Sequence, residues 1–570
     1  MQTKVSTDNL TRLAAFSAFI SLFLVLFGPL DIFVHNSDEF SSTPAELVSI
    51  LLLMAGALFA LVFTVLFLSP RVVKNAVFKG LAFLVLGSWV ISNFLYGEYG
   101  RLDGKELVIN TWSSLAFVQT AVLLLLLFLI VKLEIDNVFK LTGVVFLMGL
   151  LSSAIGIMSL ETKDSQIPAA DFPSTLTQFS PSKNVLHIVL DELGSDIFIH
   201  VVESDDRLKQ ALDGFTIFSD ALSVYPSTEM SILVLMTGEV YRNNGPKRAF
   251  IKKVRKQNKG IKRLESLGYE LDAHTRCQLG ALRRCTLINS RILNEDLADI
   301  EALRLLDIFI FKSVPDYLKP DVYNNEKWLF LAMSNHNSYL KFQSGVAHLL
   351  FKKFVEDISV SDNSSPRYKF FHSMVTHAPS DLDADCDIVD EDQASGVTKT
   401  EFVKCGLGQF SDLLEKLKEL DIYDQTMIVL SSDHGDYWID DSVDVGKFKS
   451  RGIRIGMFTR ASAALAIKPF DARGPVAMTQ APVSLRDIPQ TILAANGLDQ
   501  DTSVDISSAT RDVFSVNPNE DREREFLFYV WEHKYWAEEV LPPITTIKIN
   551  GRRKDPQAWS IPASAVRSTE

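Results

Sequence analysis

Five stretches without any Asp, Glu, Lys or Arg lie within the first 160 residues, and they constrain the fold more than any other feature. They cover residues 13–30, 47–68, 80–96, 111–131 and 141–160. A helix needs about 20 apolar residues to cross a bilayer, and apolar flanks extend the two shorter stretches. A single stretch is also compatible with a buried helix or a signal peptide. Five in succession predict a bundle of five transmembrane helices.

The charges of the connecting loops predict the orientation of this bundle. The segment before the first stretch carries two basic residues, and the second connection, "SPRVVKNAVFK", carries three and no acid. The first connection, residues 31–46, carries four acidic residues and neither Lys nor Arg. Basic loops remain in the cytoplasm. We therefore expect the N-terminus inside, and everything after Leu160 outside.

The four cysteines all lie in the part of the chain expected outside the cytoplasm. They are Cys277, Cys285, Cys386 and Cys405. An even number of cysteines in an oxidising compartment favours disulfides. Three pairings are open, of which Cys277–Cys285 with Cys386–Cys405 is the most local; four free buried thiols are the alternative.

The net charge of −13 argues against nucleic acid as a partner. One segment has a positive net charge, unlike the chain as a whole. It is "KRAFIKKVRKQNKGIKR", residues 247–263, which holds nine basic residues and no acid. It is either a solvated helix face or a patch that rests on anionic lipid headgroups.

The remainder of the chain shows the pattern of one large α/β domain. Residues 161–183 are polar and contain prolines, which is typical of a linker. From residue 184 to 570, short apolar strands alternate with helical patterns such as "FSDLLEKLKELDIYD". We expect a membrane domain over 1–160, a linker over 161–183 and an extracytoplasmic domain over 184–570.

Acidic and imidazole side chains follow three of these strands. Asp191 ends "NVLHIVLD", Asp433 and His434 follow "TMIVLSS", and His377 follows "KFFHSMVT". Sheets of this kind place ligands beyond the carboxyl ends of their strands. Carboxylate and imidazole suit Zn²⁺ or Mn²⁺. Alternatively, Asp191 caps a helix and His377 is an ordinary loop histidine.

A candidate nucleophile lies in "YPSTEMSILVLMTG". Pro226 and Ser227 indicate a helix start. Thr228 then lies in the first turn, where backbone N–H groups favour an anion. A metal ion beside the Thr228 hydroxyl would lower its pKa and allow it to attack phosphorus. In the alternative interpretation Ser227 caps the helix and Thr228 has no role.

These motifs resemble the alkaline phosphatase superfamily in its sulfatase-like branch. More narrowly, the chain is similar to membrane-anchored lipoteichoic acid synthases, phosphoethanolamine transferases and phosphoglycerol transferases. The resemblance covers the whole plan of five spans, linker and extracytoplasmic domain. Its motifs are "NVLHIVLDELGSD", "TEMSILVLMTG", "HSMVTHAP", "YDQTMIVLSSDHGD", "GKFKSRGIRIGMF" and "PVSLRDIPQTILAANG".

The resemblance implies an α/β sandwich with a central mixed sheet after the five-helix bundle. It assigns one divalent metal ion, Zn²⁺ or Mn²⁺, to Asp191, Thr228, Asp433 and His434. His377 and Lys447 are implied to bind substrate, and Ser231 and His372 are further candidates. It also implies a bacterial inner membrane, with the catalytic domain in the periplasm.

Two departures from the sulfatase pattern matter. Sulfatases form formylglycine in a C/S-x-P-x-R motif, but counted from Thr228 the proline and arginine positions are Met230 and Ile232. Formylglycine is therefore not expected. Sulfatases also use a second acid after the first ligand, here Glu192, which leaves a second metal ion or Ca²⁺ as an alternative.

The resemblance predicts transfer of a phospho-head-group, of phosphoethanolamine or phosphoglycerol type. The donor would be a membrane phospholipid, and the acceptor an envelope glycan or lipid, through a phosphothreonine at Thr228. Hydrolysis of phosphate or sulfate esters uses the same residues and is the first alternative. An inactive membrane scaffold is the second.

The expected topology has a direct test. A reporter that works only outside the cytoplasm should be active when fused after Thr162 and inactive when fused near Arg71, because the loop charges place these points on opposite sides. The reverse pattern of reporter activity would overturn both the orientation and the case for disulfides.

Overall fold

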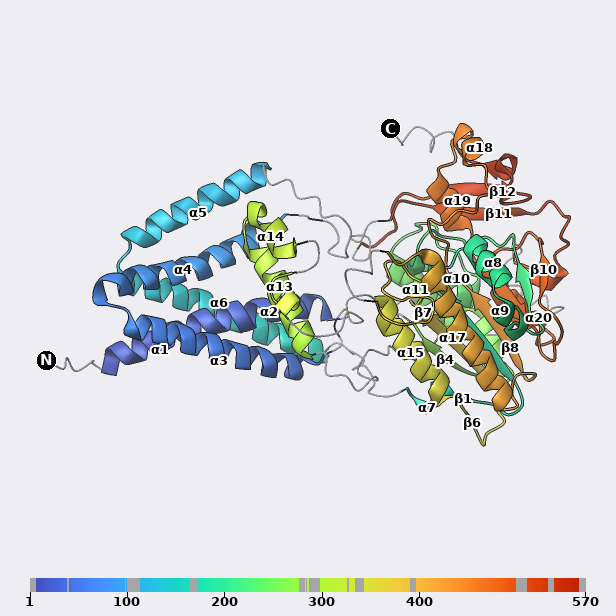
Figure 1. Ribbon diagram of the computed structural model, residues 1–570, viewed down its shortest axis with the longest axis horizontal. Coiled ribbons are helices and arrows are strands. Elements are labelled where there is room, and N and C mark those ends of the chain that lie inside the picture. The colour runs from blue at the N-terminus through green and yellow to red at the C-terminus, as the bar shows by residue number, and fades with distance from the viewer. Residues whose placement is uncertain are drawn as a thin grey trace. The chain divides into compact units, whose positions relative to one another are not determined.

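The structure is a computed structural model of the chain, shown in Figure 1. It describes residues 7–37, 40, 42–97, 99, 113–162, 172–275, 282, 284–286, 298–324, 328–333, 343–389, 396–498, 510–531 and 538–562. The chain forms two compact units. The first, here called the membrane unit, comprises Met1–Ile167 and Asn294–His336, and the second, the catalytic unit, comprises Pro168–Leu293 and Asn337–Glu570.

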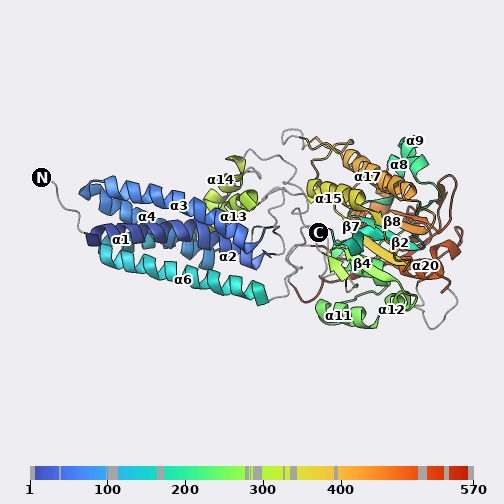
Figure 2. The ribbon, with the colours of Figure 1, turned by 90° about the horizontal axis from the view of Figure 1, so that it is seen from below.

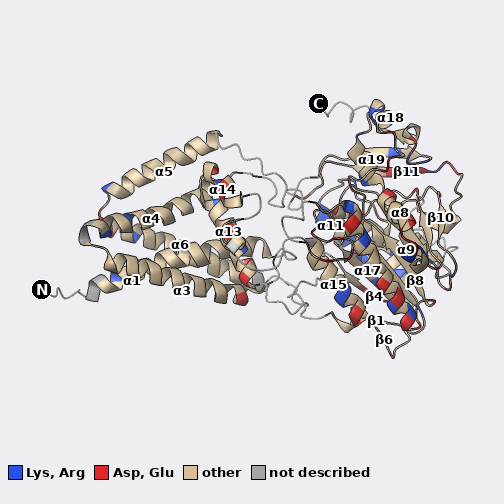
Figure 3. Cartoon of the chain, viewed as in Figure 1, with Lys and Arg blue, Asp and Glu red and all other residues tan. Residues whose placement is uncertain are grey.

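Five helical stretches of the membrane unit are long and apolar enough to cross a bilayer, as the sequence predicted. They are Leu10–His35, Pro44–Leu68, Val73–Phe94, Ser114–Lys132 and Ile135–Ser159. Figure 3 shows few charged residues along them. The corresponding helices are α1 (Thr7–Leu22), α2 (Gly28–His35), α3 (Pro44–Leu68), α4 (Arg71–Phe94), α5 (Ser114–Lys132) and α6 (Ile135–Thr162), with one π-helical turn, Phe23–Phe27, between α1 and α2.

A helix from the middle of the chain completes the membrane unit. Helices α13 (Ala298–Ser313) and α14 (Lys319–Tyr323) belong to it, although the expected boundary assigned all of 184–570 to the other domain. Leu305, Leu306 and Phe309 of α13 lie in the same buried cluster as the membrane helices. Helix α13 approaches α2 closely because Gly28 has no side chain: a Cβ there would lie 2.2 Å from the Phe309 ring.

Polar contacts also fasten this inserted segment. The buried Gln119 side chain of α5 donates to Asp316 Oδ1 at 2.9 Å, and the Asp316 backbone N–H donates to Gln119 Oε1 at 2.8 Å. The Tyr99 hydroxyl donates to the same carboxylate at 2.6 Å. Because buried polar groups need partners, this reciprocal pair specifies where the segment docks.

Within the described residues, the catalytic unit is built on one mixed sheet of eight strands, as expected for the fold class. The order is β10-β3-β9-β8-β2-β7-β4-β5, and β9 runs antiparallel to both of its neighbours. The strands are β2 (Asn184–Leu190), β3 (Thr216–Phe218), β4 (Glu270–His274), β5 (Arg284–Thr286), β7 (Arg367–Ser373), β8 (Thr426–Ser431), β9 (Leu465–Lys468) and β10 (Ala477–Thr479).

Helices cover both faces of this sheet (Figure 2). All seven residues of β2 are buried, and alternate side chains enter two different cores. One face carries α10 (Thr228–Thr237), α11 (Lys247–Gln257), α12 (Lys259–Ser266) and α20 (Ile488–Ala494). The other carries α8 (Ser195–Ser204), α9 (Asp206–Ala211), α15 (Gln343–Asp357) and α17 (Lys399–Glu419).

The smaller elements lie around this sandwich. Two short strands, β1 (Gln178–Phe179) and β6 (Ser359–Val360), pair in parallel, and β11 (Glu523–Phe528), β12 (Thr545–Asn550) and β13 (Trp559–Ser560) form an antiparallel sheet. The remaining short helices are α7 (Ser174–Thr177), α18 (Val445–Ser450) and α19 (Ile455–Ala461).

The predicted disulfide between Cys386 and Cys405 is formed. It joins the loop after β7 to α17, across 19 residues of sequence. The second predicted disulfide, Cys277–Cys285, stays a prediction, because Cys277 lies outside the described residues.

The antiparallel C-terminal sheet is fastened to the segment that precedes α10. Arg524 donates to Asp220 Oδ2 at 2.8 Å, and the Arg553 backbone N–H donates to Asp220 Oδ1 at 2.8 Å. The Leu527 backbone N–H donates to the Val224 carbonyl at 2.8 Å. The C-terminal sheet therefore supports the stretch of chain that leads into Thr228.

Arg553 is the most deeply buried basic residue of this attachment. Its side chain is 1% exposed and makes two hydrogen bonds to Asp196, of 2.5 and 2.9 Å. Replacing it in Arg553→Met should lower the free energy of unfolding by about 3–5 kcal/mol, because the Asp196 carboxylate then lacks its main partner. Denaturant unfolding of the purified full-length protein, followed by tryptophan fluorescence, measures this loss.

Lys554 provides the matched control. Its ammonium lies 3.1 Å from the same carboxylate, but its side chain is 40% exposed. Lys554→Met should cost no more than about 1 kcal/mol, as exposed ion pairs do. Equal losses for the two variants would contradict the importance assigned to the buried pair.

Candidate active site

The order of three parallel strands brings the predicted strand-end residues together. Strand β2 lies between β7 and β8, and Val189 of β2 is paired with His372 on one side and with Ser431 on the other. Asp191 therefore emerges beside His372, and Asp433 emerges two residues beyond Ser431. The carboxyl ends of parallel strands meet at one edge of the sheet, where α/β folds place their ligands.

Asp191, Asp433 and His434 form a compact group of potential metal ligands, here called the acidic group. Their ligand atoms all lie within 4.8 Å of one another, and all three residues are buried. Asp191 Oδ1 and Asp433 Oδ2 have no hydrogen-bond partner among the described residues. Two buried, unsatisfied carboxylate oxygens at one point are costly without a cation. The residues present therefore fit a divalent metal ion.

The backbone around Asp433 and His434 orients both side chains. Asp433 Oδ1 accepts hydrogen bonds from the N–H groups of His434 and Glu192, at 2.9 and 3.1 Å. His434 Nδ1 lies 2.8 Å from the carbonyl of Gly435, and Nε2, the nitrogen available to a metal ion, lies 3.3 Å from Asp433 Oδ2. A Cβ at Gly435 would lie 2.0 Å from the Thr459 carbonyl, so only glycine fits there.

Asp191 is held by two residues of the segment around the end of β7. His372 Nε2 lies 2.8 Å from Asp191 Oδ2, and the Thr376 hydroxyl donates to the Asp191 carbonyl at 2.7 Å. Burial by itself raises the pKa of Asp191, but the His372 hydrogen bond and the charges of His377 and His434 lower it below its ordinary value. Asp191 is therefore ionised at neutral pH, as a metal ligand must be.

Thr228 is the first residue of α10, and its hydroxyl donates to Asp191 Oδ2 at 3.2 Å. The sequence predicted this helix start correctly, with Ser227 at the N-cap position. The expectation that the Ser227 side chain caps the helix is wrong: it makes no capping hydrogen bond and instead contacts the Tyr529 hydroxyl at 2.7 Å. The first turn of α10 is therefore left without a side-chain cap.

Ser231 lies one turn further along α10. Its hydroxyl donates to the Ser227 carbonyl at 2.8 Å, and the residue is 3% exposed. This backbone hydrogen bond satisfies the Ser231 hydroxyl within its own helix. The structure therefore gives Thr228, and not Ser231, the direct contact with the acidic group.

Glu192 faces a cationic side chain, and its carboxylate is not part of the group of potential metal ligands. Arg460 Nη2 lies 2.8 Å from Glu192 Oε1, and His377 Nε2 lies 4.0 Å from Glu192 Oε2. Burial by itself raises the pKa of Glu192, but Arg460, His377 and Lys399 lower it to about 2. Glu192 adopts a left-handed backbone conformation, with φ of 60°.

Two basic residues that the sequence analysis did not select lie beside this centre. Arg460 Nη1 is 3.1 Å from His434 Nδ1, and Lys399 Nζ is 3.1 Å from Asp436 Oδ2. Lys399 also donates to the carbonyls of Glu192 and Thr376. Arg460 follows the quoted "GKFKSRGIRIGMF" motif by two residues. A search for basic residues just beyond that motif would have found it.

Lys447 is not brought to this centre. Its side chain is 73% exposed and pairs with Asp444 at 3.1 Å, three residues earlier in the chain. Asp444 also accepts from the Lys447 backbone N–H, as the N-cap of α18. In the structure, Arg460 and Lys399 occupy the surroundings that the sequence analysis expected Lys447 to reach.

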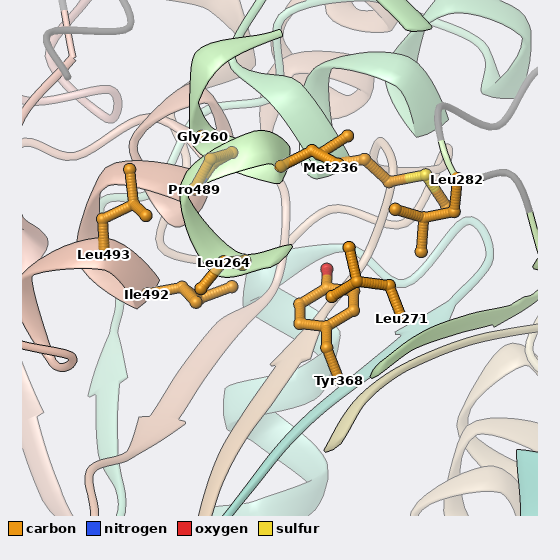
Figure 4. A pocket seen from close by; sticks show the side chains of 10 residues that line it. Met236, Gly260, Leu264, Leu271, Leu282, Tyr368, Pro489, Ile492 and Leu493 are labelled. Atoms are coloured by element: carbon orange, nitrogen blue, oxygen red, sulfur yellow. The ribbon is translucent and has the colours of Figure 1, made fainter. Parts of the chain in front are cut away.

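A small apolar pocket lies elsewhere in the catalytic unit (Figure 4). It is lined by Met236 of α10, by residues of α12 and α20, and by Tyr368 of β7. None of the residues of the acidic group lines it. This pocket is therefore separate from the candidate active site.

Comparison with known proteins assigns the family. The sequence family described as sulfatase matches residues 183–498, more than half of the chain. The chain therefore belongs to the sulfatase family. No curated protein sequence matches it.

Several solved structures are similar to the chain at low identity and with low TM-scores. The integral membrane lipooligosaccharide phosphoethanolamine transferase A (EptA) from Neisseria meningitidis is 13% identical, over 87% of this chain and 98% of that one, with a TM-score of 0.32. The lipoteichoic acid synthase LtaP from Listeria monocytogenes is 10% identical, over 69% and 90%, with a TM-score of 0.34. An alkaline phosphatase superfamily protein from Vibrio parahaemolyticus is 13% identical, over 69% and 86%, with a TM-score of 0.39.

The acidic group makes metal binding testable. Asp433→Ala and His434→Ala should each remove most of the bound metal while leaving the fold intact, because strand-end ligands contribute little to core packing. Elemental analysis of the purified protein measures the metal, and circular dichroism checks the fold. Lys447→Ala, at the exposed position, should keep its metal. Full occupancy in both ligand variants would refute the assignment.

Proposed function

We propose that this chain transfers a phospho-head-group, of phosphoethanolamine or phosphoglycerol type, from a membrane phospholipid to an envelope glycan or lipid. The observation that carries the proposal is the position of Thr228. Its hydroxyl is hydrogen-bonded to Asp191, beside two carboxylate oxygens without partners, at the start of a helix that has no side-chain cap. Such a hydroxyl is suited to attack phosphorus.

One divalent ion, Zn²⁺ or Mn²⁺, would be held by Asp191, Asp433, His434 and the Thr228 oxygen. When bound, it would lower the pKa of the Thr228 hydroxyl and neutralise the developing negative charge. Asp191 accepts the hydroxyl hydrogen bond in the structure, so it already orients the nucleophile toward this group. The backbone N–H groups at the start of α10 favour an anionic phosphoryl group at the same place.

The reaction follows a double displacement. Thr228 Oγ1 attacks the phosphorus of the lipid phosphodiester, the bond from phosphorus to the diacylglycerol oxygen breaks, and the proton lost by Thr228 ends on that oxygen. A head-group phosphothreonine results. The acceptor hydroxyl then attacks the same phosphorus, Thr228 leaves, and the proton of the acceptor returns to Thr228.

His377 is the proposed residue for proton transfer and for holding a phosphoryl oxygen. Its side chain is 30% exposed, the most accessible of the three histidines around the acidic group. Glu192 Oε2 lies 4.0 Å from its Nε2, so a carboxylate is close enough to attract the ring electrostatically when it carries a proton. Arg460 and Lys399 neutralise Glu192 and Asp436, so the acidic residues around the site do not repel an anionic substrate.

The five apolar helices support a lipid donor, because they tether the catalytic unit to a bilayer. We propose a bacterial cytoplasmic membrane with the N-terminus inside and the catalytic unit in the periplasm. Hydrolysis of a phosphate or sulfate ester is the second candidate, since the matching family is described as sulfatase and hydrolysis would use the same residues. The absence of the formylglycine pattern at Met230 and Ile232 weighs against sulfate esters.

Thr228→Ala should reduce turnover by several orders of magnitude and leave metal and fold intact, because the covalent step is lost. Thr228→Ser should retain some activity, since a primary hydroxyl can still attack. Release of diacylglycerol from a labelled phospholipid, measured with the purified protein in a bilayer, follows the first step.

Ser231→Ala is the matched control, since its hydroxyl is tied to the backbone of α10. It should turn over at close to the unmodified rate. Mass spectrometry of protein from its native membrane should find an added phospho-head-group on Thr228. Normal turnover of Thr228→Ala together with an inactive Ser231→Ala would overturn the mechanism, and water as the only acceptor would establish the hydrolase.

A further inference from the structure

The basic segment singled out in the sequence forms a rigid, exposed surface on two helices. Of its nine Lys and Arg residues, Lys247 and Arg263 are buried or half-buried and seven are exposed. We call these seven the basic surface: Arg248, Lys252, Lys253, Arg255, Lys256, Lys259 and Lys262. Helices α11 and α12, which carry them, are labelled in Figure 2, and Figure 3 shows basic residues on α11.

These two helices are fixed to the catalytic unit along their other side. Ile251, Val254 and Leu264 are buried in the same core as α10. Lys247 Nζ lies 2.5 Å from Glu229 Oε1, and both side chains are at most 5% exposed. At the opposite end of α10, the Asn258 amide donates to the Thr237 carbonyl at 3.1 Å. The basic surface is therefore held in place and is not a mobile tail.

Six of the seven charges of this surface have no oppositely charged partner among the described residues. Within the part of the chain that the structure describes, Arg248, Lys252, Lys253, Lys256, Lys259 and Lys262 form no ion pair. Residues 247–264 contain no acid, although the chain as a whole carries a net charge of −13. Seven exposed like charges repel one another, so their clustering favours an anionic partner over plain solvation.

We propose that the basic surface docks on the anionic lipid headgroups of the bilayer that the five apolar helices cross. Charge complementarity selects this partner, since clusters of Lys and Arg on amphipathic helices bind acidic lipid headgroups. The tether to the same bilayer supplies a high effective concentration, so each contact can be weak. The proposal needs the membrane unit but not the phosphoryl-transfer mechanism.

Docking here would act on the helix that bears Thr228. Lys247 begins α11 and pairs with Glu229, the residue next to Thr228 in α10. Asn258, between α11 and α12, holds the other end of α10. A bilayer contact of α11 and α12 would therefore fix the orientation of the nucleophile helix with respect to the lipid surface.

The test is lysine accessibility in full-length protein embedded in nanodiscs. Nanodiscs of phosphatidylcholine alone are compared with nanodiscs that also contain phosphatidylglycerol, and amine acylation is quantified by mass spectrometry. Lys252, Lys253 and Lys256 should react several-fold more slowly with phosphatidylglycerol present, and high salt should restore their rates. Lys352 and Lys548, exposed lysines on other elements, should not change.

Charge-reversal variants provide the second measurement. Lys252→Glu, Lys253→Glu and Lys256→Glu combined should abolish the protection of Lys259 and Lys262. Lys352→Glu, Lys449→Glu and Lys548→Glu combined change the net charge equally and should preserve it. Identical acylation rates in both nanodiscs would overturn the proposal. So would protection by soluble dextran sulfate without protection by phosphatidylglycerol, which would assign the surface to an acidic polymer.

Discussion

Two fully buried carboxylates at one point of the catalytic unit set the conditions for everything around them. Asp191 and Asp433 are each 0% exposed and present oxygens without hydrogen-bond partners toward a shared space. Like charges in a medium of low polarity destabilise each other unless a cation or a proton intervenes. The hydrogen bonds from His372, Thr228 and two backbone N–H groups hold these carboxylates in place. The lowered pKa of Asp191 favours a cation over a proton there.

The residues around the two carboxylates form pairs of opposite charge. Glu192 and Asp436 add two further acids close to the centre, and Arg460 and Lys399 offset them one for one. Two further side chains complete the surroundings: the Thr228 hydroxyl, which donates to Asp191, and the partly exposed His377. Under the proposed function, this site would bind an anionic group through a metal ion and the start of α10, with Thr228 as the nucleophile and His377 as the proton carrier.

The sequence predicted the parts of this site that depend on strands and on short motifs. Strand ends fix where Asp191, Asp433 and His434 emerge, and the parallel order of β7, β2 and β8 then brings them together. Contacts that depend on distant chain segments were not predictable. Ser227 contacts Tyr529, which is 302 residues away, and nothing near Ser227 in the sequence indicates this partner. Lys447 matched a motif, but its local pairing with Asp444 keeps its side chain at the surface.

The inserted helix α13 limits how early the membrane unit can finish folding during synthesis. The five apolar helices leave the ribosome first, but their buried cluster includes Leu305, Leu306 and Phe309, which are synthesised some 140 residues after the last of these helices. Strands β7 and β8 follow later still. The membrane unit can therefore reach its final packing only after a large part of the catalytic chain, including Asp191, has been made, whereas Asp433 and His434 are made later than α13. A chain truncated at the linker would leave the membrane helices without α13, and a catalytic fragment expressed alone would carry α13 with its apolar face uncovered.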